Sequence, residues 1–168
     1  MIGHLRTLLT LGVLGVLVLV GLTWGWSAVT APFPKSAPQR VCVSTKVRPG
    51  ERVSAPKVTV SVYNASQRSG LAEATLSAFE NQGFGAGNVG NAPKGTVVPF
   101  AQVWTTHPQN PAVLLVVSRL GPQAHVVTKH LNGPGVVVVV GNAFQRLVAG
   151  RSSVKVTSTA TICSPPTA

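Results

Sequence analysis

The sequence predicts an α+β protein, a split βαβ-like two-layer sandwich of order β-α-β-β-α-β behind one N-terminal transmembrane helix. Three observations lead to this prediction. An uncharged apolar run fills residues 7–26, a strand-like alternation over residues 57–63 precedes a helical pattern over residues 70–82, and five consecutive valines occupy residues 136–140. Periods of 2 and 3.6 residues separate strands from amphipathic helices. The order of such segments along the chain then gives the fold class.

The apolar run over residues 7–26 reads TLLTLGVLGVLVLVGLTWGW and carries no charged side chain. About 20 such residues cross a bilayer core of ~30 Å, and the two tryptophans at its far end suit the headgroup interface. We therefore expect a retained signal-anchor, with residues 1–6 in the cytoplasm. A cleaved signal peptide is the alternative, since residues 29–31 resemble a cleavage site; the length of the run and Pro32 favour the anchor.

Positive charges flank both ends of this run, with Arg6 on one side and Lys35, Arg40 and Lys46 on the other. A count of these charges alone favours the reverse orientation. Long downstream domains, however, cross the membrane largely regardless of charge, and the cysteines are typical of an oxidising compartment. We expect a single-pass cell-membrane protein with its C-terminal domain outside the cytoplasm.

Residues 27–56 are expected to form a Pro-rich linker and a lead-in segment, because Pro-rich chains act as extended spacers. Cys42 and Cys163 are the two cysteines of the chain and bracket its folded part. In an oxidising compartment they predict a disulfide. Closing a loop on the order of 100 residues stabilises by ~4.7 kcal/mol in the chain-entropy model. Two free or lipidated thiols are the alternative.

The first strand and helix have local signals at both ends. Residues 57–63 alternate valines with polar side chains, which indicates a strand buried on one face. Apolar side chains recur at helical spacing over residues 70–82. Ser69 is expected to cap the first-turn amides. Gly83 is expected to close the helix, so that the following phenylalanine packs back on Phe79.

The second half of the chain continues the pattern. Residues 84–91 and 97–105 are predicted strands, and an Asn-Pro pair and a glycine bracket a helix over residues 110–121. The valines of residues 136–140 indicate an interior strand that is buried on both faces. Residues 151–168 read as a polar tail, with Val-Lys-Val adding an edge strand.

The charge of the chain is strongly positive, with 14 Lys and Arg against 3 acids and a formal net charge of +11. Glu51, Glu73 and Glu80 are the acids, which leaves no carboxylate cluster for a hard cation. Such a charge attracts polyanions of any kind. The expected compartment favours an anionic wall polymer. Nucleic acid is the alternative, but it is disfavoured because aromatic residues are not interleaved with the basic ones.

Several motifs could suggest nucleotide binding, metal binding or catalysis, but their context in the sequence argues against each of these functions. The G-x-G-x-x-G over residues 85–90 follows a helix instead of opening one, so nucleotide binding is not expected. His107, His125 and His130 lie on separate segments, so no metal is expected. Neither a G-x-S-x-G elbow nor two carboxylates placed to flank a bond occur. We expect a non-enzyme with no cofactor and no small-molecule substrate.

The best candidate site is the loop that enters the first domain helix. Asn64, Ser66, Arg68 and Ser69 converge where a helix amino end favours an anion. A well-made helix cap is the alternative reading. The other basic residues expected to contact the polymer are Lys57, Lys94, Arg119, Lys129, Arg146 and Arg151.

The runs VTVSVYNASQRSGLAEATLSAFENQGF, VGNAP and VVVVVGNAF resemble the LytR C-terminal domain family. The resemblance covers residues 57–149 and sets the domain at residues 57–150. It implies a domain that is either appended to a phosphotransferase attaching polymers to peptidoglycan or stands alone behind one span, as in small actinobacterial envelope-integrity proteins. This chain is similar to the stand-alone type, although it has no Asp where relatives usually carry acids near the last strand.

The sequence therefore predicts a non-catalytic, membrane-anchored, extracytoplasmic binding or scaffolding module that supports the cell envelope. Its expected partners are the membrane and an anionic wall polymer or an envelope protein. Two alternatives stay open: an accessory subunit of a wall-polymer phosphotransferase, which the resemblance implies, and a nucleic-acid-binding protein.

Overall fold

The computed structural model describes the backbone of residues 2–30 and 41–166. The chain divides into two units, Met1–Gln39 and Arg40–Ala168. Residues 31–40 of the predicted linker lie outside the described residues.

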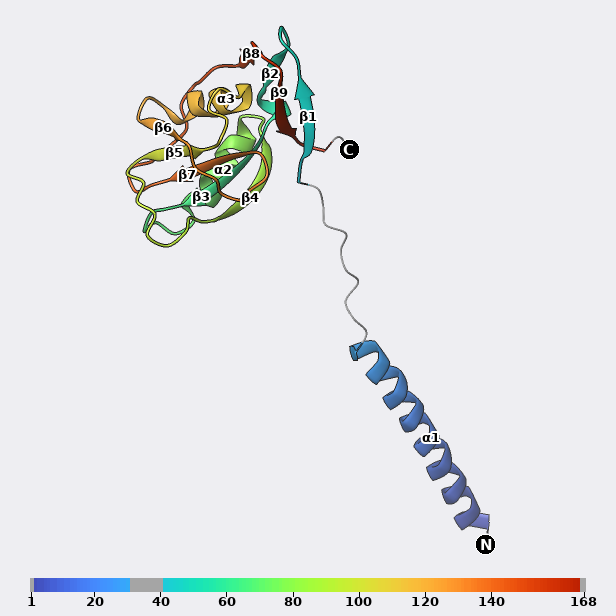
Figure 1. Ribbon diagram of the computed structural model, residues 1–168. Helices are drawn as coiled ribbons and strands as arrows, with labels where there is room; N and C mark the ends of the chain where they lie inside the picture. The colour runs from blue at the N-terminus through green and yellow to red at the C-terminus, as the bar shows by residue number, and fades with distance from the viewer. Residues whose placement is uncertain (1, 31–40, 167–168) are drawn as a thin grey trace. The chain divides into compact units, whose positions relative to one another are not determined.

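The first unit contains helix α1 (Ile2–Thr30), whose side chains are described at residues 9–22, 24 and 26 (Figure 1). Within these described residues, no helix is both long enough and apolar enough to cross a membrane. The transmembrane segment over residues 7–26 stays a prediction.

The second unit is built on a mixed five-stranded sheet (Figure 1). The second strand in the sheet is parallel to both of its neighbours, and the fourth is antiparallel to the third and parallel to the fifth. In spatial order the strands are β4 (Gly85–Asn91), β3 (Thr59–Asn64), β7 (Val136–Val140), β5 (Ala101–Trp104) and β6 (Ala124–Val127).

The α+β class is confirmed, but the predicted split arrangement is wrong. In each βαβ unit, β3-α2-β4 and β5-α3-β6, the two strands are hydrogen-bonded neighbours. Strand β6 was not predicted, because Val126 and Val127 stand alone in a polar stretch. Since β6 occupies the place beside β5, the valine strand β7 lies between the two units and joins them.

Helices α2 (Leu71–Asn81) and α3 (Pro111–Leu120) cover one face of the sheet (Figure 1). The largest fully buried side chains include Phe79 and Leu115 of these helices. They share one core cluster with the residues of β7 that face them, such as Val138. Burial of this apolar area is the main contribution to the stability of the domain.

A loop covers the other face of β7. Val137 and Val139 form a separate cluster with Trp104, against which Leu131 and Tyr63 pack. The Tyr63 hydroxyl donates to the carbonyl of Asn132 at 2.8 Å, and the Lys129 ammonium lies 4.0 Å from the centroid of the Trp104 ring. Both faces of the valine strand are thus buried, as predicted from its composition.

The residues predicted to cap or close the two helices can be compared with those found at the ends of α2 and α3. Asn110 caps α3, accepting from the Ala112 amide at 3.0 Å, as predicted. Gly83 closes α2 at φ 85°, and the rings of Phe79 and Phe84 pack edge to face at 5.2 Å, also as predicted. The predicted Ser69 cap is wrong: the N-cap of α2 is Gly70, at φ 73° and without a side-chain cap bond.

A buried serine fixes the irregular pairing of β3 with β4. The register shifts after Val60, where a bulge over Gly87 and Asn88 interrupts the ladder. The fully buried Ser61 hydroxyl accepts from the Asn88 amide at 3.0 Å and donates to the Pro134 carbonyl at 2.6 Å. A side chain at Gly87 would overlap this hydroxyl, so the bulge requires glycine.

The segments before and after the sheet domain pair with each other as two short antiparallel ribbons. Strand β1 (Val43–Val47) pairs with β9 (Ala160–Ser164), and β2 (Arg52–Ser54) pairs with β8 (Ser153–Lys155). The short 3-10 helix η1 (Ala55–Lys57) leads into the sheet. The edge strand predicted in the tail is confirmed by β8.

The predicted disulfide between Cys42 and Cys163 is confirmed. The cysteines lie at the open end of the β1–β9 ribbon. Their Cα atoms are 5.5 Å apart, although they are 121 residues apart in the sequence. The bond therefore holds together the two ends of the second unit.

Candidate functional site

The predicted anion-binding loop closes on itself through its own side chains. The Asn64 carboxamide oxygen accepts from the Ser66 amide at 2.8 Å and from the Ser66 hydroxyl at 2.7 Å. The Asn64 carboxamide nitrogen donates to the Arg68 carbonyl at 2.7 Å, and the Ser66 hydroxyl accepts from the Arg68 amide at 3.0 Å. These bonds explain the residue types as those of a closed loop. Among the described residues, no side chain of the loop caps α2, so the alternative of a well-made helix cap is not found.

The Arg68 guanidinium ties this loop to the segment that follows β7. Its Nη1 donates to the Phe144 carbonyl at 2.6 Å, while the Gln67 amide donates to the Asn142 carboxamide oxygen at 3.0 Å. The loop also borders a shallow hollow with Ser69 and Asn91. Arg68 thus has a structural role in joining two loops, and anion binding at this loop stays a prediction.

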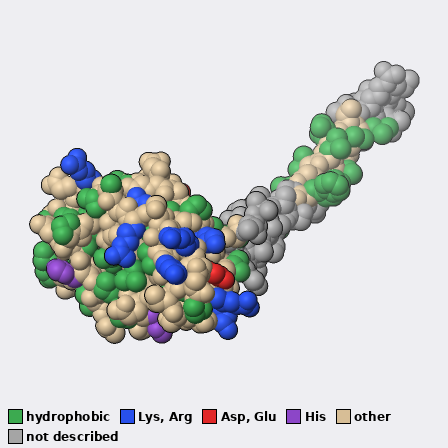
Figure 2. Space-filling model, turned by 90° about the horizontal axis from the view of Figure 1, so that it is seen from above, with side chains coloured by type: hydrophobic (Ala, Val, Ile, Leu, Met, Phe, Trp, Pro, Cys, Tyr) green, Lys and Arg blue, Asp and Glu red, His purple; other side chains and the backbone are tan. Residues whose placement is uncertain are grey.

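Two of the predicted basic residues meet on another face of the domain. Arg119 of α3 donates from Nη2 to the Arg151 carbonyl at 2.8 Å. Strands β2 and β8 place Arg52 opposite Lys155, which follows Arg151 by four residues in the chain. We name Arg52, Arg119, Arg151 and Lys155 the cationic face; Figure 2 shows Lys and Arg side chains gathered on the side of the molecule that carries α3, β2 and β8.

Over the residues that the structure describes, no ion pair compensates the positive charge of the cationic face. All three acids of the chain lie between residues 41 and 166, yet in the described part of the chain no carboxylate forms an ion pair with a basic side chain. Arg52, Arg151 and Lys155 are exposed. Unpaired, exposed cations that lie close together attract a polyanion more strongly than the same number dispersed.

The remaining predicted basic residues are dispersed. Lys57 lies in η1, Lys94 follows β4, Lys129 covers Trp104 and Arg146 follows β7. The predicted single basic surface is thus only partly assembled. Arg52 and Lys155 were missed because they lie on strands that pair across about a hundred residues; the two cysteines, which bracket these strands, were the one signal that the segments meet.

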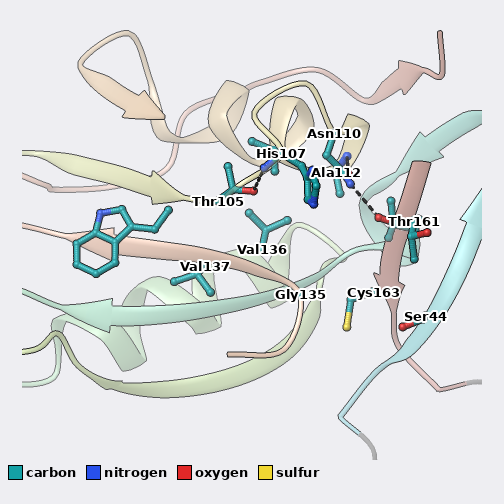
Figure 3. A pocket seen from close by; sticks show the side chains of 13 residues that line it. Ser44, Thr105, His107, Asn110, Ala112, Gly135, Val136, Val137, Thr161 and Cys163 are labelled. Carbon is teal, nitrogen blue, oxygen red and sulfur yellow. Dashed lines mark hydrogen bonds between the residues drawn. The ribbon is translucent and has the colours of Figure 1, made fainter. Parts of the chain in front are cut away.

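A second hollow region lies where the β1–β9 ribbon meets the start of α3 (Figure 3). One cavity of about 250 Å³ is lined from β1, β9, residues 104–113 and the start of β7. A neighbouring hollow of about 340 Å³ shares His107, Asn110 and Thr161 with it. The Asn110 carboxamide donates to the Thr161 carbonyl at 2.8 Å and fixes this junction. We name the two hollows together the β9 groove, which no sequence pattern predicted.

The glycine motif and the three histidines, for which no ligand was expected, occupy ordinary structural positions. The G-x-G-x-x-G of residues 85–90 lies within strand β4 and opens no helix. His107 lines the β9 groove, His125 lies on β6, and the ring of His130 hydrogen-bonds the Asn132 carboxamide at 3.0 Å. Over the described residues, no group of three or more His, Cys, Asp or Glu side chains is placed to hold a metal ion.

Three features define this class of domain: two adjacent βαβ units, the closed loop after β3 and the valine strand β7. Comparison with known families shows to which family the chain belongs. Residues 57–144 match the family described as the LytR cell envelope-related transcriptional attenuator, and the chain belongs to this family. The resemblance seen in the sequence is confirmed. The match extends from η1 to Phe144 and includes neither terminal ribbon.

One solved structure is similar to the chain. It is the soluble domain of a conserved hypothetical secreted protein from Mycobacterium marinum, with 25% sequence identity and a TM-score of 0.44. The similarity covers 60% of this chain and 77% of that one. No curated protein matches the chain.

Proposed function

We propose that this protein is a non-catalytic, extracytoplasmic envelope module that binds an anionic wall polymer through its cationic face. The single observation that carries the proposal is the convergence of Arg52, Arg151 and Lys155 beside Arg119, without a carboxylate partner. Membership of an envelope-related family agrees with this role.

The location outside the cytoplasm is part of the proposal. The Cys42–Cys163 disulfide supports it, because such bonds form and persist in oxidising compartments. The similar protein from Mycobacterium marinum is described as secreted. The apolar run of residues 7–26 supports attachment to the membrane, because it has the composition and length of a single span.

The test compares two triple variants with the same net charge. Arg52→Gln, Arg151→Gln and Lys155→Gln together remove three of the four charges of the cationic face, whereas Lys57→Gln, Lys94→Gln and Lys129→Gln remove three dispersed charges. The full chain in detergent is titrated with poly(glycerol phosphate) at several salt concentrations. We expect the first variant to lower the slope of log K against log salt by about 2, at roughly 0.7 per lost phosphate contact. The second variant is expected to change it little.

Equal losses in the two triple variants would show that binding follows net charge alone, and the cationic face would then be rejected. A 20-base-pair DNA duplex is the third titration. If the duplex bound more tightly than poly(glycerol phosphate) at the same salt concentration, and only the cationic-face variant lost it, the nucleic-acid alternative would replace the wall polymer.

A further inference from the structure

The β9 groove differs in chemistry from the rest of this basic protein. No Lys, Arg, Asp or Glu lines either of its two described hollows. Lys46 lies opposite Thr161 in the ribbon but lines neither hollow. The polar lining consists of hydroxyl and carboxamide groups with one imidazole: Ser44, Thr105, His107, Gln109, Asn110, Ser158, Thr159 and Thr161.

Several of these polar side chains have no partner within the protein. In the part of the chain that the structure describes, the side chains of Ser44, Gln109, Thr159 and Thr161 form no hydrogen bond. All four residues are exposed. A hydroxyl both donates and accepts, and a carboxamide does the same through separate atoms. The groove therefore offers neutral donors and acceptors that are free to bind a ligand.

The inner wall of the groove is apolar. Val136, Val137, Val113 and Ile162 line the hollow of about 250 Å³, together with Trp104 (Figure 3). Asn110 uses its carboxamide twice, on Ala112 and on Thr161, so it holds the shape of the groove. With hollows of about 250 and 340 Å³ that share three residues, the groove has the volume of a small-ligand site.

We infer that the β9 groove binds an uncharged saccharide of two or three rings. A saccharide presents many hydroxyls, each a donor and an acceptor, at its edges and C–H groups on its ring faces. The free hydroxyls and carboxamide of the groove match the edges, and the apolar wall matches the ring faces. An anionic ligand is disfavoured because no cation in the lining would compensate for its desolvation. The groove is thus a second site, separate from the cationic face.

The test uses N,N′,N″-triacetylchitotriose, a neutral trisaccharide, with the full chain in a detergent that has no sugar headgroup. Binding is followed by saturation-transfer NMR and calorimetry. Ser44→Ala, Gln109→Ala and Thr159→Ala together remove free groups of the groove. The matched control is Ser77→Ala, Gln123→Ala and Thr128→Ala, three exposed residues of the same types outside the groove.

We expect the groove variant to lose affinity by at least about tenfold, because each lost hydrogen bond is worth a factor of about 2 to 10. The control variant and the cationic-face variant are expected to bind as the unchanged chain does, with little dependence on salt. Absence of binding by the unchanged chain, or equal affinity of the groove and control variants, would overturn the inference. Neither outcome affects the polymer titration that tests the cationic face.

Discussion

The sheet domain and the terminal ribbons of the second unit are held together in different ways. In the sheet domain every residue of β7 is buried, because one core cluster covers each face of the strand. In the β1–β9 ribbon, four of the five residues of β1 are exposed, and Val43 is 44% exposed. A two-stranded ribbon is marginal by itself. The ribbons therefore depend on the disulfide and on a few contacts with the sheet domain.

This difference also separates the family features from the proposed binding sites. The family match ends at Phe144 and begins at Lys57. Arg52, Arg151 and Lys155 of the cationic face lie outside it, as do the ribbon residues of the β9 groove. Both proposed sites thus lie along the seam where the ribbons pack on the sheet domain, so each proposed site needs both regions.

The largest expected effect comes from breaking the disulfide. Cys42→Ser with Cys163→Ser should lower the free energy of unfolding by about 2–5 kcal/mol, because the bond closes a loop of more than a hundred residues. Hydrogen exchange is expected to rise more at the amides of β1 and β9 than at those of β3 and β7. Non-reducing mass spectrometry of the unchanged chain isolated from cells should show the intact bond, which also tests the proposed extracytoplasmic location.

Two outcomes would contradict this comparison. Equal increases in exchange across β1, β9, β3 and β7 would show that the ribbons and the sheet open as one unit. Two free thiols in the chain isolated from cells would remove the main support for the location outside the cytoplasm.

A second prediction compares two serines that each join two segments, one in the sheet and one at the seam. Ser61 is fully buried, so Ser61→Ala leaves the Asn88 amide and the Pro134 carbonyl without this partner. We expect a loss of about 1–3 kcal/mol. Ser118 is partly exposed and accepts from the Arg151 amide at 3.0 Å. Ser118→Ala is expected to cost about 1 kcal/mol or less, since water can replace the hydroxyl.

Urea denaturation of the full chain in detergent measures both serine variants. If Ser118→Ala cost as much as Ser61→Ala, the seam would be as rigid and dry as the interior of the sheet. The distinction between the two regions would then fail.

Features with local sequence signals were predictable, and features that depend on distant pairing were not. The cap of α3 needs only Asn110 and Pro111, and the end of α2 needs only Gly83. The sheet order depended on β6, whose short apolar stretch has no periodicity. The cationic face required the pairing of β2 with β8, for which no local pattern exists.

The cap of α2 shows how a local signal can mislead. Ser69 and Gly70 are both acceptable N-cap residues. The hydrogen bonds among Asn64, Ser66 and Arg68 turn the chain tightly before the helix. The chain then enters α2 through a left-handed residue at φ 73°, a conformation that glycine adopts without strain. The geometry of the loop therefore places Gly70, and not Ser69, at the N-cap of α2.

The smallest expected effects come from Asn110, which caps α3, and from Ser69, which does not cap α2. Asn110→Ala removes the bond to the Ala112 amide and the bond to the Thr161 carbonyl of β9, and should cost about 1 kcal/mol, within a range of about 0.5–2. Ser69→Ala should cost close to nothing, because in the described part of the chain the Ser69 side chain forms no hydrogen bond. Asn110→Ser keeps a capping oxygen but removes the carboxamide N–H that donates to the Thr161 carbonyl, so its cost isolates the contact with the ribbon. Urea midpoints of the three variants, together with hydrogen exchange at β9, measure these differences.

Equal costs for Asn110→Ala and Ser69→Ala would contradict the assigned caps. If Asn110→Ser left exchange at β9 unchanged, the bond to Thr161 would not hold the ribbon on the sheet domain.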